Sequence, residues 1–281
     1  MGDGFLDKVT AAVRAHGPLC VGIDPSGALL ADWGLTDDPA GLRAFGDACV
    51  EAFAGAVAVV KPQVAFFERH GAAGLAELER LIAAARSAGL VVIADAKRGD
   101  IDSTADAYAD AWLSESSPLA ADAVTAHAYL GLAALEPLVR RAGDTGRGVL
   151  VVARSSNPEG RSLQLATTAD GRAVEDMLLG DIAALNASEE VATGAVGAVV
   201  GATLAPSNFP LSQLGGVILA PGMGAQGAGP AEVAALFAGC APGTVVASSS
   251  RGLLKAGPDP EGLRLAAGQL QGELSAVMVP E

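Results

Sequence analysis

Short, continuous apolar runs recur along the chain, and Ala/Leu-rich stretches with a helical period separate them. The runs lack the polar–apolar alternation of a half-exposed strand, so they predict buried parallel strands that are covered on both faces. The expected strands span residues 19–24, 56–63, 90–97, 121–129, 148–155, 195–202, 216–222 and 244–251.

The segments between these runs have the spacing of amphipathic helices. In segment 72–88, apolar residues three or four apart form one face, and Gly89 follows as the expected C-cap. Segment 38–54 places Pro39 in its first turn and repeats apolar residues with the same spacing. We interpret both segments as crossover helices between parallel strands.

Eight strand-then-helix units predict an α/β fold, a single (β/α)8 TIM barrel spanning residues 1–281. The rival is a doubly wound open sheet, but "GIDPSG" after the first strand does not supply its glycine fingerprint. The active site of such a barrel lies at the C-terminal ends of the strands. The irregular stretch 156–172 follows the fifth strand, and its length indicates an active-site loop or an external excursion.

Composition and charge narrow the range of partners. A formal net charge of −14 argues against nucleic acid or an anionic membrane as a partner. The first residues lack the pattern of a signal peptide and no apolar run reaches about 18 residues, so we expect a cytoplasmic protein. Cys20, Cys49 and Cys240 are expected to be reduced core cysteines, and neither they nor the three histidines have metal-ligand spacing.

Polar residues gather where the predicted strands end, so they are expected at one rim of the barrel. Lysine is rare in this chain, and two of its four lysines, Lys61 and Lys97, occupy such positions. The full set is Asp24, Lys61, Asp95, Lys97, Thr125, His127, Ser155, Ser156, Thr203, the loop "PGMGAQGAG" and residues 249–251.

The stretch "IADAKRGDIDST", residues 93–104, carries the densest charge cluster. Side chains alternate along a strand, so Asp95 and Lys97 point the same way, into the barrel mouth, while Asp100 follows a turn. Together with Lys61 these residues are expected to form an alternating chain of charges, which keeps the lysines protonated and the carboxylates ionised. A purely structural ion-pair network is the alternative.

The loops after the seventh and eighth strands have the chemistry of a phosphate site. Their glycines allow close backbone approach, Gln226 can donate an amide hydrogen, and Arg251 offers a planar fork for phosphate oxygens. Glycine-rich loops that serve only as flexible turns are the alternative.

"DAKRGDIDST" resembles the D-x-K-x-x-D-I-x-x-T signature of the orotidine 5'-phosphate decarboxylase family. The motifs "GIDPS", "VVKPQVAFFE", "SNPEG", "GAQG" and "SSRGLLKAG" accompany it in the family's order, between about Pro18 and Pro258, and are similar to the longer bacterial branch. The resemblance implies a cofactor-independent decarboxylase that converts orotidine 5'-phosphate to UMP, the last step of de novo pyrimidine nucleotide biosynthesis.

The resemblance also implies roles for individual residues. Lys97 matches the proton donor to pyrimidine C6, and Lys61 matches the lysine that completes the charge network and approaches the ribose. Asp95 matches a carboxylate close to the substrate carboxylate, and we assign it to positioning Lys97. Asp24 matches an acceptor for a ribose hydroxyl, with a turn or cap before Pro25 as the alternative.

The base and the phosphate have matching residues as well. Ser156 matches the serine that hydrogen-bonds the pyrimidine, although the neighbouring Ser155 is an equally near candidate. Gln226 and Arg251 match the phosphate ligands. The chain departs from the family at Ala128, where a proline is expected, and this affects the shape of the fourth loop.

The family's homodimer is implied too, with Asp100, Ile101 and Thr104 reaching the partner's site. The alternatives are a helix N-cap for Thr104 and a core contact for Ile101.

Two other functions are compatible with the sequence. One is another phosphosugar lyase or aldolase on the same barrel, which would use a divalent metal or a Schiff-base lysine. Flanking aspartates raise a lysine pKa and so disfavour the Schiff base. The other is a non-catalytic barrel that binds a phosphorylated ligand.

Overall fold

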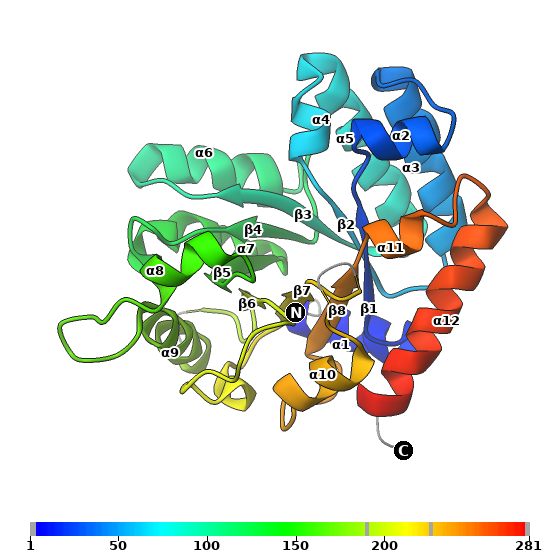
Figure 1. The fold of residues 1–281 in the computed structure, drawn as a ribbon. Helices are drawn as coiled ribbons and strands as arrows, with labels where there is room; N and C mark the ends of the chain where they lie inside the picture. The colour runs from blue at the N-terminus through cyan, green and yellow to red at the C-terminus, as the bar shows by residue number, and fades with distance from the viewer. Residues whose placement is uncertain (1–3, 189–190, 225–226, 279–281) are drawn as a thin grey trace.

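The computed structural model describes residues 4–188, 191–224 and 227–278. Within these residues, eight parallel strands form a closed barrel in chain order, as the sequence predicted (Figure 1). The strands are β1 (Leu19–Ile23), β2 (Val59–Pro62), β3 (Val91–Arg98), β4 (Ala123–Ala126), β5 (Gly148–Arg154), β6 (Val196–Val200), β7 (Ile218–Pro221) and β8 (Val245–Ser249). The barrel closes because β1 pairs with both β2 and β8, Cys20 lying opposite Val59 on one side and Ser248 on the other.

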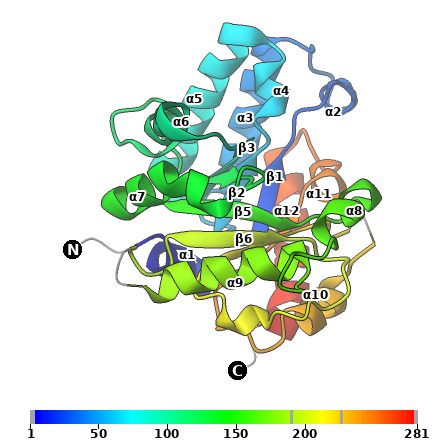
Figure 2. The ribbon, with the colours of Figure 1, turned by 90° about the vertical axis from the view of Figure 1, so that its left-hand side faces the viewer.

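Helices lie around the outer side of the barrel and at its ends (Figures 1 and 2). They are α1 (Phe5–His16), α2 (Gly27–Asp32), α3 (Pro39–Phe53), α4 (Ala65–Glu68), α5 (Gly71–Ser87), α6 (Asp102–Leu113), α7 (Glu136–Thr145), α8 (Arg161–Gln164), α9 (Val174–Ala187), α10 (Pro230–Leu236), α11 (Arg251–Leu254) and α12 (Pro260–Met278). Short 3-10 helices are η1 (Leu132–Leu135), η2 (Pro158–Gly160) and η3 (Leu211–Gln213). The stretch 156–172 therefore contains η2 and α8.

The two helices predicted from periodicity, α3 and α5, are confirmed, and Pro39 and Gly89 lie at or close to the helix ends where they were expected. Asp38 caps α3 by accepting a hydrogen bond from the backbone N–H of Gly41 at 2.9 Å, and Pro39 follows in the first turn. Helix α5 ends at Ser87, and Gly89 has the left-handed backbone (φ +82°) that commonly ends a helix.

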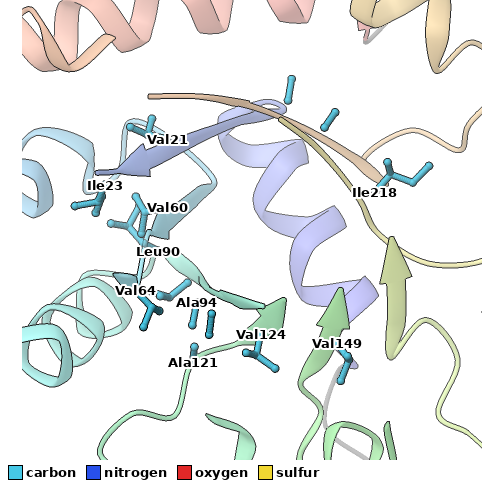
Figure 3. Packing of buried hydrophobic residues seen from close by; sticks show 14 of the residues in the cluster. Val21, Ile23, Val60, Val64, Leu90, Ala94, Ala121, Val124, Val149 and Ile218 are labelled. Carbon is cyan, nitrogen blue, oxygen red and sulfur yellow. The ribbon is translucent and has the colours of Figure 1, made fainter. Parts of the chain in front are cut away.

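One hydrophobic layer lies between the strands and the helices. Figure 3 shows part of it, with Val21, Ile23 and Val60 projecting from β1 and β2 among other buried aliphatic side chains. Continuous apolar runs are needed here, because alternate residues of each strand face this layer and the others face the barrel interior.

A second, inner hydrophobic cluster fills the barrel, and helix α1 closes its N-terminal end. Phe5, Val9 and Val13 of α1 are buried in one cluster with interior residues such as Val59 and Leu150. The ring of Phe5 lies so close to Gly148 that a Cβ there would be only 2.3 Å from it. Figure 2 shows α1 at one end of the barrel, with α8 and α11 toward the other.

Interior positions change from apolar to polar toward the C-terminal ends of the strands. Two residues after Val59 comes Lys61, and two residues after Ile93 comes Asp95. The same step leads from Ala123 to Thr125 and from Val246 to Ser248. Strand periodicity alone thus carries these polar side chains onto the barrel mouth above an apolar floor.

Two further features bear on the sequence-based expectations. No helix in the described part of the chain is both long and apolar enough to cross a membrane. The three cysteines are free thiols; Cys20 and Cys49 are buried, and Cys240 is partly buried.

Candidate active site

A cavity of about 350 Å³ opens at the C-terminal ends of the strands. Six residues that the family resemblance matched to a role line it: Asp24, Lys61, Asp95, Lys97, Ser156 and Arg251. Further lining comes from Gln63, Thr125, Val152, Ser155, Asn157, Val199, Leu219, Pro221, Gly222, Met223, Ser248 and Ser250. The cavity thus combines charged side chains at the strand ends with aliphatic ones.

Asp95 lies between two lysine ammonium groups. Its Oδ1 is 2.6 Å from Nζ of Lys97, and its Oδ2 is 2.9 Å from Nζ of Lys61. Lys61 and Asp95 are buried, whereas the side chain of Lys97 is half exposed and borders the open cavity. The carboxylate therefore holds Lys97 in place while leaving its ammonium accessible to a ligand.

The charges of this cluster stabilise each other. Burial by itself would raise the pKa of the Asp95 carboxyl, but the ammonium groups of Lys61 and Lys97 outweigh it and hold that pKa well below its usual range. Burial would lower the pKa of Lys61, and the charges of Asp95 and Asp24 overcome this and raise it. Asp95 is therefore ionised and Lys61 protonated at neutral pH.

The backbone at Lys97 is unusual. Lys97 has φ +48°, in the left-handed region that non-glycine residues seldom adopt, and the pairing of β3 with β4 shifts register between Ala94 and Arg98. Its N–H donates to Oγ1 of Thr125 at 3.0 Å. The strand is thus bent where its lysine enters the cavity.

Two site residues received no role from sequence reasoning. Gln63 accepts a hydrogen bond from Nζ of Lys61 at 3.4 Å and donates one to the backbone carbonyl of Asp95, also at 3.4 Å. Thr125 donates to Oδ1 of Asp95 at 2.8 Å. The available signal was position, since Gln63 lies two residues beyond Lys61 and Thr125 was among the rim residues.

Asp24 faces the cavity with one carboxylate oxygen engaged. Its Oδ2 accepts from Oγ of Ser250 at 2.6 Å, while its buried Oδ1 has no hydrogen-bond partner among the described residues. The alternative of a helix cap is wrong, because Ser26 caps α2 by accepting from the N–H of Leu29.

Asp100 does not join the charge cluster of its own chain. Its Oδ1 accepts a hydrogen bond from the N–H of Ile101, and it forms no ion pair with any residue the structure describes. The expected four-member chain of charges is therefore wrong for a single protomer, which brings together three members. The physical reason is that β3 ends at Arg98, so Asp100 lies beyond the strand, in the connection to α6.

Ile101 and Thr104 also lie away from the cavity. Ile101 is the N-cap residue of α6 and is 50% exposed, so the alternative of a core contact is wrong. Thr104 lies within the first turn of α6 and is exposed, so it is not the cap. Both residues are exposed, and neither lines the cavity.

The two serines after β5 line the cavity together. The hydroxyl of Ser155 donates to Oδ1 of Asn157 at 2.6 Å and accepts from Nε2 of Gln164 at 2.7 Å. Ser155 is thus tied to α8, which fixes the turn that carries Ser156.

One of the two phosphate candidates, Arg251, lies at the mouth of the cavity. Arg251 begins α11, is exposed and borders the cavity. Gln226 lies outside the described residues. In the described part of the chain, no group of three or more His, Cys, Asp or Glu residues is arranged to hold a metal ion.

A family model described as "Orotidine 5'-phosphate decarboxylase / HUMPS family" matches residues 17–264. The chain belongs to this family. The assignment agrees with the motifs and with the closed barrel.

Close relatives match the chain over nearly its whole length. An orotidine 5'-phosphate decarboxylase of Streptomyces coelicolor is 50% identical over 96% of this chain and 96% of its own. One of Salinispora arenicola is 48% identical over 98% of this chain and 99% of its own. A crystal structure from Streptomyces avermitilis, assigned to the same enzyme, has a TM-score of 0.94 and 50% identity, covering 99% of this chain and 97% of its own. The resemblance and the enzyme class that the motifs indicated are confirmed.

Proposed function

We propose that this protein converts orotidine 5'-phosphate to UMP and carbon dioxide without a cofactor, as the last step of de novo pyrimidine nucleotide synthesis. The observation that carries the proposal is the ammonium of Lys97, held by Asp95 at the edge of a cavity that Arg251 also borders. Family membership and full-length relatives that are named for this reaction support it.

Lys97 supplies the proton that completes the reaction. The bond between C6 of the pyrimidine and the carboxylate breaks, its electron pair stays on C6, and carbon dioxide leaves. This pair lies in the ring plane, where the π system cannot delocalise it, so a fixed ammonium is an effective stabiliser. Nζ of Lys97 then transfers a proton to C6, and the resulting amine takes a proton from water.

Asp95 and Lys61 hold Lys97 for this step. Asp95 is ionised because two ammonium groups face it, so it accepts from Lys97 rather than competing as an acid. The buried ammonium of Lys61 forms an ion pair with the other oxygen of this carboxylate, Oδ2 of Asp95.

The rest of the cavity suits a nucleotide. Oδ1 of Asp24 has no hydrogen-bond partner among the described residues, so it can accept a hydrogen bond from a ribose hydroxyl. Arg251 can bind phosphate oxygens with its planar guanidinium, with Gln226 as a second ligand. Ser156 lies on the cavity wall where it can meet the base.

We also propose a homodimer in which Asp100, Ile101 and Thr104 reach the neighbouring site. Two observations support it: Asp100 is unpaired within the described part of its own chain, and Ile101 is a large apolar side chain that is half exposed beside it. We further propose that residues 1–281 form one barrel domain, because the first and last strands pair, and that it works in the cytoplasm, where free cysteines persist.

The test is carbon dioxide release from orotidine 5'-phosphate after exhaustive treatment with a chelator. We expect turnover to survive the treatment. Turnover that disappears and returns with a divalent metal would contradict the cofactor-free reaction, and no turnover in any preparation would leave only a phospholigand-binding barrel. A Schiff base on Lys61 is disfavoured, because the raised pKa of Lys61 keeps its amine protonated.

A further inference from the structure

We propose that Thr125 is a positioning residue, whose hydroxyl fixes both the carboxylate of Asp95 and the backbone of Lys97 in the arrangement that proton transfer requires. This inference rests on the proposed decarboxylation.

The hydroxyl of Thr125 bridges the two residues. Oγ1 donates to Oδ1 of Asp95 at 2.8 Å and accepts from the N–H of Lys97 at 3.0 Å. Thr125 is only 1% exposed, so neither bond competes with bulk water. One side chain from β4 thus contacts both members of the Asp95–Lys97 pair of β3.

The strand pairing explains why this hydroxyl is needed. Ala94 of β3 lies opposite Val124 of β4, and Arg98 lies opposite Ala126. The three residues from Asp95 to Lys97 therefore face the single residue Thr125. A bulge of this kind interrupts the regular ladder, and the Thr125 hydroxyl supplies the acceptor that the ladder would otherwise provide for the N–H of Lys97.

The left-handed backbone of Lys97 increases the dependence on Thr125. Such a conformation costs free energy in a non-glycine residue and persists only where its surroundings fix it. The hydrogen bond to Thr125 holds the peptide before Lys97, and the N–H of His127 holds the next residue by donating to the carbonyl of Arg98 at 2.9 Å.

Thr125 is also an uncharged hydrogen-bond donor to Asp95, in contrast to the two lysines. Oδ1 of Asp95 accepts from both Nζ of Lys97 and the hydroxyl of Thr125. When Nζ gives up its proton to C6, its hydrogen bond to Asp95 weakens, whereas the hydroxyl cannot lose its proton at this pH. Thr125 therefore keeps the carboxylate oriented during the step in which Lys97 changes charge.

Three substitutions separate the hydroxyl from the packing of the side chain. Thr125→Val keeps the size and branching but removes the hydroxyl, Thr125→Ser keeps the hydroxyl but removes the methyl group, and Thr125→Ala removes both. Thr145→Val is the matched control, because the hydroxyl of Thr145 donates within its own helix, α7, to the carbonyl of Arg141.

We expect Thr125→Val and Thr125→Ala to lower kcat about 100-fold, the effect of misplacing a reacting group by roughly 1 Å. The dissociation constant for UMP, measured by calorimetry, should stay within about threefold, because the hydroxyl acts on protein groups. Thr125→Ser should keep kcat within about fivefold of the wild type although it loses the methyl group, and Thr145→Val should match the wild type.

The ranking decides the inference. If Thr125 acts only through packing, Thr125→Val should be more active than Thr125→Ser, and this ranking would overturn the proposal. A kcat of Thr125→Val within about threefold of the wild type would also overturn it. If Thr125→Val does not fold, as judged by circular dichroism, the Ser and Ala variants decide, since they differ by one oxygen atom. Absence of turnover in the wild type and in Thr145→Val would instead overturn the decarboxylase proposal, and with it this role.

Discussion

Lys61 and Asp95 form a buried ion pair that joins β2 to β3, with 2.9 Å between Nζ and Oδ2 and side chains only 7% and 10% exposed. Two charges are costly to remove from water unless each has partners. Here the pair persists because Asp95 meets a second ammonium, that of Lys97, and because Lys61 also donates to Gln63. The pair is thus part of the fold as well as of the site.

We predict that Lys61→Met destabilises the protein by about 3 kcal/mol, because it leaves the buried carboxylate of Asp95 with one ammonium partner. The free energy of unfolding in urea measures this. Lys255→Met is the control, since Lys255 is exposed and its loss should change stability by less than about 0.5 kcal/mol. Equal stability of the two variants would contradict the argument.

The pH dependence of stability should report the ionisation of Asp95. The pKa of its carboxyl is lower in the folded protein than the value of about 4 in an unfolded chain. Its stabilising contribution is therefore present above about pH 4 and is lost as the pH falls toward the folded-state pKa. We predict that the stability advantage of the wild type over Asp95→Asn begins to fall below about pH 4 and continues to fall toward the folded-state pKa, whereas a constant difference would refute the shift.

Lys97→Ala should lower kcat by at least about a thousandfold, because the ammonium acts on charge that appears only in the transition state. Binding of UMP should weaken by less than about tenfold, since the product lacks that charge. Single-turnover rates and UMP titrations give the two values. Near-normal turnover would end the proposed mechanism, and Lys255→Ala controls for general loss of positive charge.

Arg251→Ala should raise KM for orotidine 5'-phosphate about 100-fold, because two charge-assisted hydrogen bonds to phosphate contribute about 3 kcal/mol together. The phosphate-free nucleoside should react equally slowly with the variant and the wild type. If Arg251→Ala loses as much activity toward the nucleoside as toward orotidine 5'-phosphate, Arg251 does not bind phosphate. Arg140→Ala, which removes an arginine from the exposed surface of α7, should have no effect.

Mixing two inactive variants tests the shared site. In a mixed dimer of Lys97→Ala and Asp100→Ala, one site carries both defects and the other receives Lys97 from one chain and Asp100 from its partner. Random pairing makes half the dimers mixed, with one intact site in two, so about a quarter of the wild-type activity should return. Confirmed subunit exchange without any returning activity would mean that each chain builds its own site.

Much of the architecture could be predicted because it depends on local patterns. Each apolar run is long enough for one buried strand, and helix-end signals such as Pro39 and Gly89 act through their immediate neighbours. The meeting of Lys61 with Asp95 could also be predicted, since the ends of adjacent parallel strands share one rim.

Contacts that depend on the register between strands could not be predicted. The role of Thr125 follows from the bulge in β3, where Asp95, Ala96 and Lys97 lie opposite one residue of β4. The residue types in this stretch do not indicate a bulge. The spacing of Asp100 from Asp95 and Lys97 suggested that it joins their charge cluster. The path of the backbone after β3 determines whether it does, and the carboxylate of Asp100 accepts a hydrogen bond from Ile101 instead. Ile101 illustrates the same limit, because exposure depends on the whole fold rather than on residue type.

The pairing of β1 with β8 has a consequence for synthesis on the ribosome. Leu19 lies opposite Ala247, so the two strands that seal the barrel are almost the whole chain apart. Until β8 has emerged, β1 and β7 each keep one unpaired edge, a template for association with other chains. The residues that complete the cavity, Ser248, Ser250 and Arg251, emerge with that same strand. A nascent chain therefore completes its nucleotide pocket in the step that removes its exposed edges, and ligand binding can stabilise only chains that have already closed.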